Sequence, residues 1–465
     1  MTILNEEVHV KDVTNLKEPK PISEELNIET KVELVSLLKD INSIVDEIDK
    51  GIFKKFYVPD IEYCYKIEDN RELYSPAIIF CSLFNLLWSH GLNYESDVLL
   101  LGLSDKIHNY LVNITDGTIM EIGCYWLTNF HTVDRYMNER LELLLNVNNK
   151  SNDNNIDDES YKEELFIYTT RKRQCELICT DIYNIWTEKI CVIISNLLHP
   201  PTFFIETMPD LNGNFDEYIP KMFESDVMRA LDNVLVFFDQ VFWRMKCLNL
   251  EDTVAEKTLK TLLNYFDKIC FNGLVTSPGL FLENRSVSFN YNLNKFCQYI
   301  EKYELTEFEP FPYLYEIKRL LDLTKTELAN ATDCLQLAPK LTSIQIQSIL
   351  CKNIFEDIKN PSLMKFLKKS TKRGPDEKPV IEELLISIDH KNVDYPFINN
   401  SLDTLNINEI FMPTLLKIPI IEKIMTLYKP SNKIKHCNIG SNELKLEKTS
   451  SNDSFKIEDF IEFKD

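Results

Sequence analysis

Residues 262–300 read LLNYFDKICFNGLVTSPGLFLENRSVSFNYNLNKFCQYI, and this stretch decides the fold that the sequence predicts. Apolar residues recur at helical spacing on both sides of a short polar segment. We expect the first helix to end at Asn272-Gly273, because these residue types commonly end helices. We expect the second helix to begin at Asn290-Tyr291-Asn292. The stretch therefore predicts two consecutive helices joined by a loop.

The composition favours helices over the whole chain. Glycine contributes 10 of 465 residues, about 2% against ~7% in typical proteins. Phosphate-binding α/β folds need glycine for left-handed turns and close backbone approach, and neither G-x-G-x-x-G nor G-x-x-x-x-G-K-[ST] occurs in the sequence. The hydrophobic content of 44% is sufficient for large cores. A length of 465 residues predicts two or three compact units.

The charge is strongly acidic, with 51 Lys and Arg against 73 Asp and Glu and a net charge of −22. A field of this sign repels phosphate backbones and anionic lipids, so we expect no nucleic-acid partner. The first 30 residues are polar and acidic and do not resemble a signal peptide. The longest apolar run is shorter than the ~18 residues that span a bilayer. The sequence therefore predicts a cytoplasmic protein with reduced cysteines and no membrane span.

The fold class expected from these patterns is all-α: two fused helical-bundle lobes joined by long helices, with an extended C-terminal strap. The predicted segments are a disordered acidic arm at 1–30, an N-terminal helical lobe at 31–200, a C-terminal helical lobe at 201–360 and a mostly irregular segment at 361–465. Within them we expect a disordered loop at 146–160 and a partly packed strap at 390–428.

The residue order at the two central helices resembles the signature of the dilute (DIL) domain family. The resemblance rests on Phe271-Asn272-x-Leu274 and, beyond the loop, on Asn290-Tyr291-Asn292. A second segment, Tyr125-Trp126-Leu127-Thr128-Asn129, is similar to the family's Phe-Trp-Leu-Ser-Asn motif. The residues to which the resemblance assigns a structural role are Trp126, Asn129, Phe271, Asn272, Leu274, Asn290, Tyr291 and Asn292. Similar segments elsewhere extend the resemblance over roughly residues 72–420. The loop at 281–286 departs from the family pattern, because it lacks the usual tryptophan and glycine.

This resemblance implies a module like the cargo-binding globular tail of class V myosins. Such a module binds adaptor or receptor proteins on organelles or vesicles through grooves between helices, with cytoskeletal proteins as further candidate partners. The resemblance implies a cytoplasmic protein that is peripheral on organelles through its partners, and it implies no cofactor. Motor, IQ and coiled-coil motifs are missing from the sequence, so we expect a free-standing DIL-domain protein. The alternative in the same class is a DIL-domain scaffold unconnected with actin-based transport.

An all-α metal-dependent enzyme is the remote alternative. Asp157-Asp158 could belong to a Mg²⁺ site, but such a site needs carboxylates one helical turn apart on facing helices. These two lie in the Asn-rich loop, and the seven histidines are isolated from one another. His131 is expected to be a half-buried structural residue. We therefore expect no enzyme, no catalytic residue and no metal ligand.

Two short basic clusters interrupt the acidic chain, one at 171–173 and one at 365–373. The plain interpretation is a solvated helix face in each case. The alternative is a docking or regulatory site, because phosphorylation of Ser370 or Thr371 would reverse the local charge. Ser370 and Thr371 are therefore the candidate regulatory residues.

Overall fold

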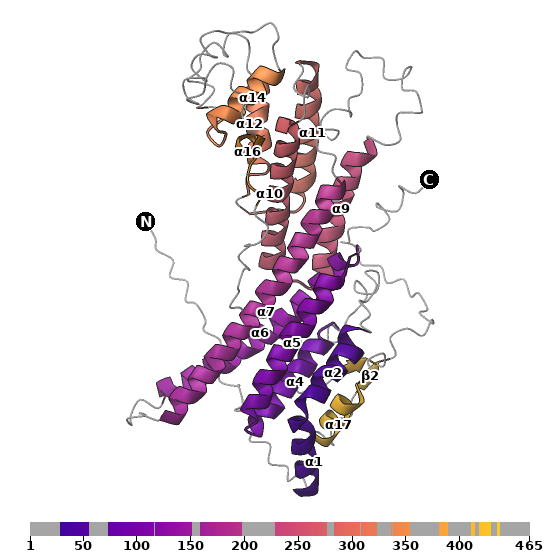
Figure 1. Ribbon diagram of the computed structural model, residues 1–465, viewed down its shortest axis with the longest axis vertical. Coiled ribbons are helices and arrows are strands. Elements are labelled where there is room, and N and C mark those ends of the chain that lie inside the picture. The colour runs from indigo at the N-terminus through magenta and orange to yellow at the C-terminus, as the bar shows by residue number, and fades with distance from the viewer. Residues whose placement is uncertain are drawn as a thin grey trace, which may run out of the picture.

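Helices build nearly all of the part of the chain that the computed structural model describes (Figure 1). The described residues are 28–54, 73–115, 117–150, 159–197, 228–276, 283–306, 308–322, 336, 338–353, 381–388, 411–413, 418–428 and 435–437. Among them the only strands are β1 (Phe411–Pro413) and β2 (Lys435–Cys437), which pair in parallel. The all-α class is confirmed, and this three-residue strand pair is an addition that the sequence did not predict.

The N-terminal lobe forms around α4. Its other elements are α1 (Ile28–Lys39), α2 (Ile41–Ile48), the π-helical turn η1 (Asp49–Phe53) and α5 (Asn93–Asn113). α4 (Ser75–Ser89) begins with proline in its first turn, where no backbone N–H is needed. A helix that is apolar nearly all round belongs in the centre of a bundle. Accordingly, its only residues that are not buried are Asn85, Trp88 and Ser89.

Two long helices connect this lobe to the next. α6 (Ile119–Lys150) and α7 (Glu159–Leu197) pack against each other, and α7 also contacts helices of both lobes (Figure 1). With 39 residues, α7 is roughly 60 Å long. Gly123 of α6 lies so close to Trp186 of α7 that a Cβ atom there would overlap the indole ring. Glycine is needed at this position because the two helices approach closely.

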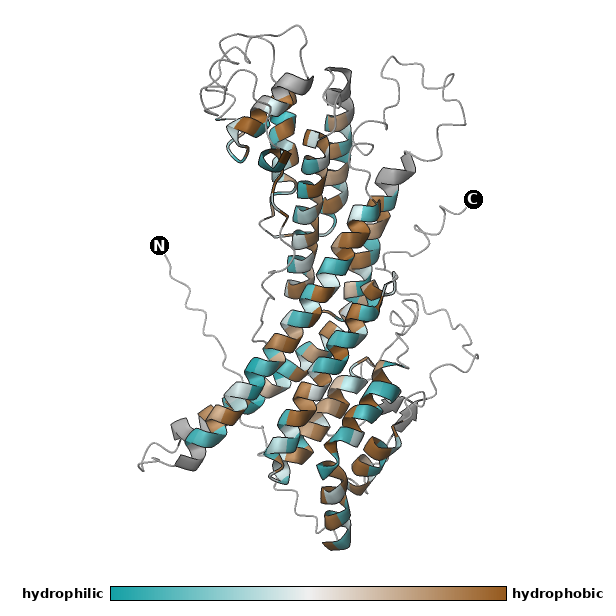
Figure 2. Cartoon of the chain, viewed as in Figure 1, coloured by the Kyte–Doolittle hydropathy of each residue, from teal (hydrophilic) through white to brown (hydrophobic). Residues whose placement is uncertain are grey.

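The C-terminal lobe has an aromatic core. Its helices are α9 (Met228–Cys247), α10 (Asp252–Thr276), α11 (Glu283–Glu301), α12 (Pro312–Leu321) and α14 (Ser343–Asn353). The ring centroids of Phe266 and Phe296 lie 4.9 Å apart, and Phe311 lies 4.9 Å from Phe296. The buried carboxylate of Asp267 accepts the N–H groups of Tyr313 and Leu314, both at 3.0 Å, and so caps the start of α12. Apolar faces turn inward on most helices (Figure 2).

Several predicted boundaries are wrong. α10 does not end at Asn272-Gly273 but continues to Thr276, because Leu274 and Val275 are buried and packing holds the last turn. α11 begins at Glu283, ahead of the predicted start, and its Phe289 is buried. α6 reaches Lys150 and α7 starts at Glu159, so both ends of the predicted loop 146–160 are helical. Residues 151–158 of that loop lie outside the described residues.

The C-terminal segment packs on both lobes. α16 (Ile381–Leu384) contacts α10 and α14, whereas α17 (Pro419–Tyr428) contacts α1 and α2 (Figure 1). The strap was expected to be extended, but this end of it is helical, because Ile421, Ile424 and Met425 recur at helical spacing and are buried. Residues 389–410, and with them most of the predicted strap, lie outside the described part. The predicted domain limits stay a prediction.

Candidate protein-interaction site

Trp126 and Asn129 hold α6 against α4. Trp126 is fully buried, and its ring centroid lies 4.7 Å from that of Phe53. The carboxamide oxygen of Asn129 accepts the N–H of Ala77 at 3.1 Å, and its nitrogen donates to the carbonyl of Leu73 at 3.2 Å. These bonds use backbone groups that the first turn of α4 cannot pair by itself. The pair therefore positions the central helix of the N-terminal lobe.

Phe271, Asn272 and Leu274 perform a comparable task in the C-terminal lobe. Phe271 and Leu274 are buried. Asn272 makes two hydrogen bonds to one residue: its Nδ2 donates to the carbonyl of Ile386 at 3.0 Å, and its Oδ1 accepts the N–H of Ile386 at 2.8 Å. A carboxamide thus pairs with the backbone as a neighbouring β-strand would. Asn272 thereby fixes the segment that contains α16.

The remaining signature residues lie side by side on α11 and face different surroundings. Asn290 donates to Oδ1 of Asp322 at 2.7 Å, Asn292 is fully buried, and Tyr291 is 53% exposed. The eight signature residues therefore occupy two lobes and do not assemble into one surface site. The candidate regulatory residues Ser370 and Thr371 lie outside the described residues.

The basic cluster at 171–173 divides into a buried Arg171 and an exposed Arg173. Arg171 is only 1% exposed: its Nε binds Asp97 of α5 at 2.8 Å, and its guanidinium lies 5.4 Å from the centroid of the Trp88 ring. Lys172 and Arg173 both bind Glu176 on their own helix. A buried arginine needs such partners, because an unpaired buried charge is strongly unfavourable. Arg171 therefore joins α7 to α5 and is not available for docking.

His131 and Cys175, whose residue types could support metal or acid–base chemistry, are both buried. His131 is buried, more than the half-burial expected, and its Nε2 lies 3.0 Å from Oε2 of Glu251. Burial raises the pKa of the Cys175 thiol well above its usual range. The described residues contain no group of three or more His, Cys, Asp or Glu side chains arranged to hold a metal ion. Asp157 and Asp158 are not among them. Within the same residues, no helix combines the length and apolarity needed to cross a membrane.

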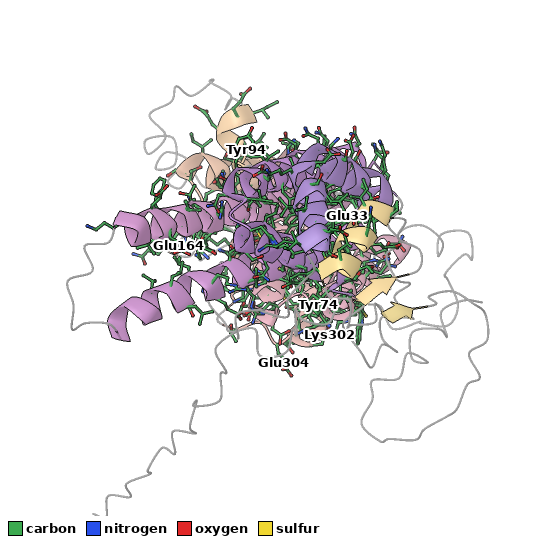
Figure 3. All side chains as sticks on the ribbon, turned by 90° about the horizontal axis from the view of Figure 1, so that it is seen from below. Glu33, Tyr74, Tyr94, Glu164, Lys302 and Glu304 are labelled. Carbon is green, nitrogen blue, oxygen red and sulfur yellow. The ribbon has the colours of Figure 1, made fainter. Side chains whose placement is uncertain are left out.

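The outer side of α5 carries exposed apolar side chains. Tyr94 is 76% exposed, Leu101 55% and Val112 46%. Leu101 and Val112 follow Tyr94 by 7 and 18 residues, which places all three on one stripe of an α-helix. Tyr94 lies at the surface of the bundle (Figure 3). The opposite stripe of α5, including Leu103 and Ile107, is buried.

α7 runs beside α5 in the same direction and adds exposed apolar residues. Three contacts in succession define this arrangement: Arg171 with Asp97, His108 with Asp181 at 2.7 Å, and Lys189 with the carbonyl of Val112 at 2.6 Å. Leu177 is 54% exposed and lies between the first two contacts along α7, as Leu101 does along α5; Val192 follows at 53%. We call Tyr94, Leu101, Val112, Leu177 and Val192 the α5–α7 face.

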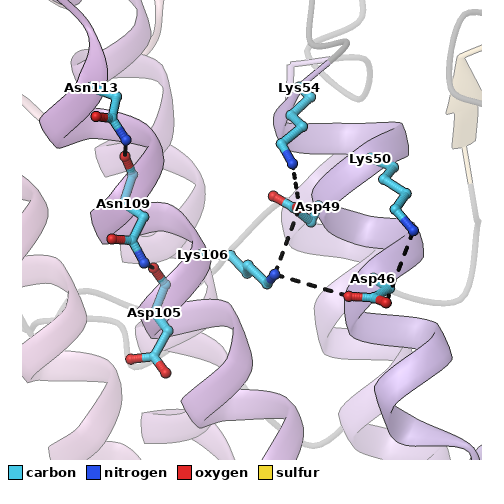
Figure 4. Close-up of polar contacts among 8 residues, drawn as sticks. All are labelled: Asp46, Asp49, Lys50, Lys54, Asp105, Lys106, Asn109 and Asn113. Atoms are coloured by element: carbon cyan, nitrogen blue, oxygen red, sulfur yellow. Dashed lines mark hydrogen bonds and ion pairs between the residues drawn. The ribbon is translucent and has the colours of Figure 1, made fainter.

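A hollow of about 410 Å³, lined by charged, carboxamide and apolar side chains, adjoins this face between η1 and α5. Its floor holds the buried carboxylate of Asp49, which binds Lys54 at 2.8 Å and Lys106 at 3.7 Å (Figure 4). The side-chain nitrogens of Asn109 and Asn113 donate to carbonyls one turn earlier, both at 2.7 Å (Figure 4). Their carboxamide oxygens can accept hydrogen bonds from a ligand. Exposed apolar anchors beside a hollow that contains polar groups have the character of a protein-binding surface.

Sequence reasoning did not predict the α5–α7 face. The signal was present in α5, where Leu101 and Val112 depart from the stripe formed by Leu103, Ile107 and Leu111. An apolar residue outside the buried stripe of an amphipathic helix points to solvent. Single exposed apolar residues are common, however. Only the packing of α7 beside α5 shows that exposed apolar residues of the two helices belong to one surface.

The described helices define a class by their fold: a two-lobed, all-helical module. Residues 257–357 match the family model of the DIL domain. Myosin-2 of Lachancea kluyveri is 25% identical over 408 residues, which cover 85% of this chain and 26% of that protein. The chain therefore spans about a quarter of the length of this curated relative.

Solved structures show the same fold. A yeast myosin 5 cargo-binding domain superposes with a TM-score of 0.69 at 22% identity, covering 87% of this chain and 100% of that one. The structure of Myo2-GTD in complex with Mmr1 gives a TM-score of 0.68 at 22% identity, with 86% and 98% covered. Residues 257–357 are therefore similar to the DIL domain, and the chain has the fold of the solved yeast myosin 5 cargo-binding domain.

Proposed function

We propose that this chain binds adaptor or receptor proteins of organelles or vesicles through the α5–α7 face, and that it acts without catalysis. The observation that carries the proposal is the gathering of five exposed apolar side chains on two adjacent parallel helices. The globular tail solved with Mmr1 supports it, because that protein has this fold and was solved with a bound partner.

The chemistry of the face indicates the shape of a partner. Leu101 and Leu177 both lie between the Arg171–Asp97 and His108–Asp181 contacts and can anchor an amphipathic helix laid along the seam between α5 and α7. Asp181 lies at the seam, where it contacts His108, and its carboxylate favours a partner with basic residues at its edge. Covering side chains that are half exposed contributes about 1 kcal/mol each, so a few anchors dominate the affinity.

The proposal places the protein in the cytoplasm, held at organelles or vesicles by its partners. The motor functions of full-length relatives are not implied, since the chain matches only about a quarter of their length. A DIL-domain scaffold without a role in transport would use the same kind of surface with different partners.

Affinity purification followed by mass spectrometry tests the proposal. The tagged wild-type chain is compared with a Leu101→Asp, Leu177→Asp double variant and with Val236→Asp, a control at a 47% exposed position on α9. We expect organelle adaptors with the wild type and the control, and their loss with the double variant. Identical partners for all three proteins would show that the α5–α7 face is not the binding site. Recovery of junctional or scaffold proteins alone would contradict the adaptor assignment.

A further inference from the structure

The surface of the N-terminal lobe on which α17 packs, which we call the seat, is distinct from the α5–α7 face. The seat is formed by α1, α2 and the end of α4 (Figure 1). Ile418, Ile421 and Ile424 of the C-terminal segment are 0% exposed, and Met425 is 1% exposed. The other side of the helix is solvated, with Lys423 and Thr426 exposed. α17 is therefore an amphipathic helix that lies with its apolar face on the seat.

Polar groups of the seat recognise α17 at its start and along its length. The two carboxylate oxygens of Glu47 on α2 accept the N–H groups of Ile420 and Ile421, both at 2.9 Å. These N–H groups are among the unpaired donors at a helix N-terminus, where a carboxylate is favoured. Glu33 on α1 binds Lys423 at 2.6 Å, and Glu33 lies beside α17 (Figure 3).

We propose that this seat is an exchangeable helix-binding site, which α17 occupies within the chain and which a partner helix of the same pattern can take over. None of the contacts just described requires that α17 be covalently attached. The partner is a short amphipathic helix that opens with proline, places Ile or Met at the positions of residues 421, 424 and 425, and carries Lys at that of residue 423.

Charge complementarity argues for such a partner. Both carboxylates that mark the seat, Glu33 and Glu47, face the helix, so a helix with a free N-terminal turn and a lysine suits them. Because α17 is tethered, its effective concentration at the seat is of millimolar order, and a partner must compete with it. The seat is thus closed in the resting chain and opens to a helix that binds better.

A peptide titration on the full-length chain tests this inference. A fluorescent peptide with the sequence of residues 417–430 is titrated into the wild type and into an Ile421→Asp, Ile424→Asp variant, whose own α17 no longer fits the seat. We expect saturable binding to the variant that is about tenfold or more tighter than to the wild type. Adding Glu47→Gln to the variant is expected to weaken binding about tenfold, because charge-assisted hydrogen bonds are lost.

Three results would overturn the inference. The first is no saturable binding to a variant whose circular dichroism matches that of the wild type. The second is that a control peptide, which carries Asp at the positions of Ile421 and Ile424, binds the variant as tightly as the unchanged peptide does. The third is a dimer of the wild type joined through exchanged α17 helices, which would assign the seat to a second copy.

A second measurement covers the case in which the variant does not fold. The same peptide with a photo-cross-linker at the position of Met425 is mixed with the wild-type chain at millimolar concentration. We expect labelling of α1 or α2 that excess unlabelled peptide prevents. Labelling spread over both lobes would contradict the inference.

Discussion

Replacing Asn129 by alanine removes the hydrogen bonds that hold the start of α4 against α6. The N–H of Ala77 would be left buried without its acceptor, at a cost of about 1–3 kcal/mol. The carbonyl of Leu73 would lose its donor, which costs about 1 kcal/mol more. The third bond, to the carbonyl of Tyr125 at 3.0 Å, lies within α6 and matters less. We expect the free energy of unfolding to fall by about 3 kcal/mol in total.

Urea unfolding followed by circular dichroism and tryptophan fluorescence measures this loss. Asn138→Ala is the matched control: the side chain lies on the same helix, but its hydrogen bond to Glu142 is exposed. A change within ~0.5 kcal/mol is expected for the control. Similar losses for the two variants would refute the argument that the buried carboxamide at position 129 positions α4.

Three further predictions rest on individual contacts. Gly123→Val is expected to destabilise the chain by about 2 kcal/mol or more in thermal unfolding, because the new side chain overlaps Trp186; unchanged stability would contradict the close helix approach. Burial raises the pKa of Asp134 to about 6, above its ordinary 3.8, so the folded chain binds more protons than the unfolded chain between these pH values, and this residue's contribution to stability falls as pH rises through that window. Asp134→Asn should reduce this slope, by at most ~3 kcal/mol in unfolding experiments from pH 4 to 7, and a slope that the substitution leaves unchanged would contradict the assignment. Asn272→Ala should speed amide hydrogen exchange in residues 381–388, measured by mass spectrometry, because the pairing with the backbone is lost; unchanged exchange would show that packing alone holds the segment.

Much of the helical framework could be predicted from the sequence, since packing helices carry apolar residues at a fixed period. The central position of α4 follows from apolarity on all sides. A capping box, a pattern that the sequence displays as Thr342-x-x-Gln345, marks the start of α14: the N–H of Thr342 donates to Oε1 of Gln345 at 2.9 Å, and the N–H of Gln345 donates to Oγ1 of Thr342 at 3.2 Å. Such signals are local, so a linear sequence is sufficient to read them.

Features set by distant contacts could not be predicted. The break expected at Asn272-Gly273 followed local propensity, but burial of the next turn kept the helix intact. Arg171 belonged to a basic run that suggests solvent, yet its partner Asp97 lies 74 positions away in sequence. The α5–α7 face has the same origin, because Leu101 and Leu177 belong to one surface only when α5 packs beside α7.

Site-specific photo-cross-linking in cells tests the central claim most directly. A photoreactive residue is placed at Leu101 in one protein and at Val236 in another, and the cross-linked products are identified by mass spectrometry. A specific adaptor adduct is predicted from position 101 and not from position 236. Adducts from position 236 alone, or the same adducts from both positions, would contradict the claim that this protein binds its partners through the α5–α7 face.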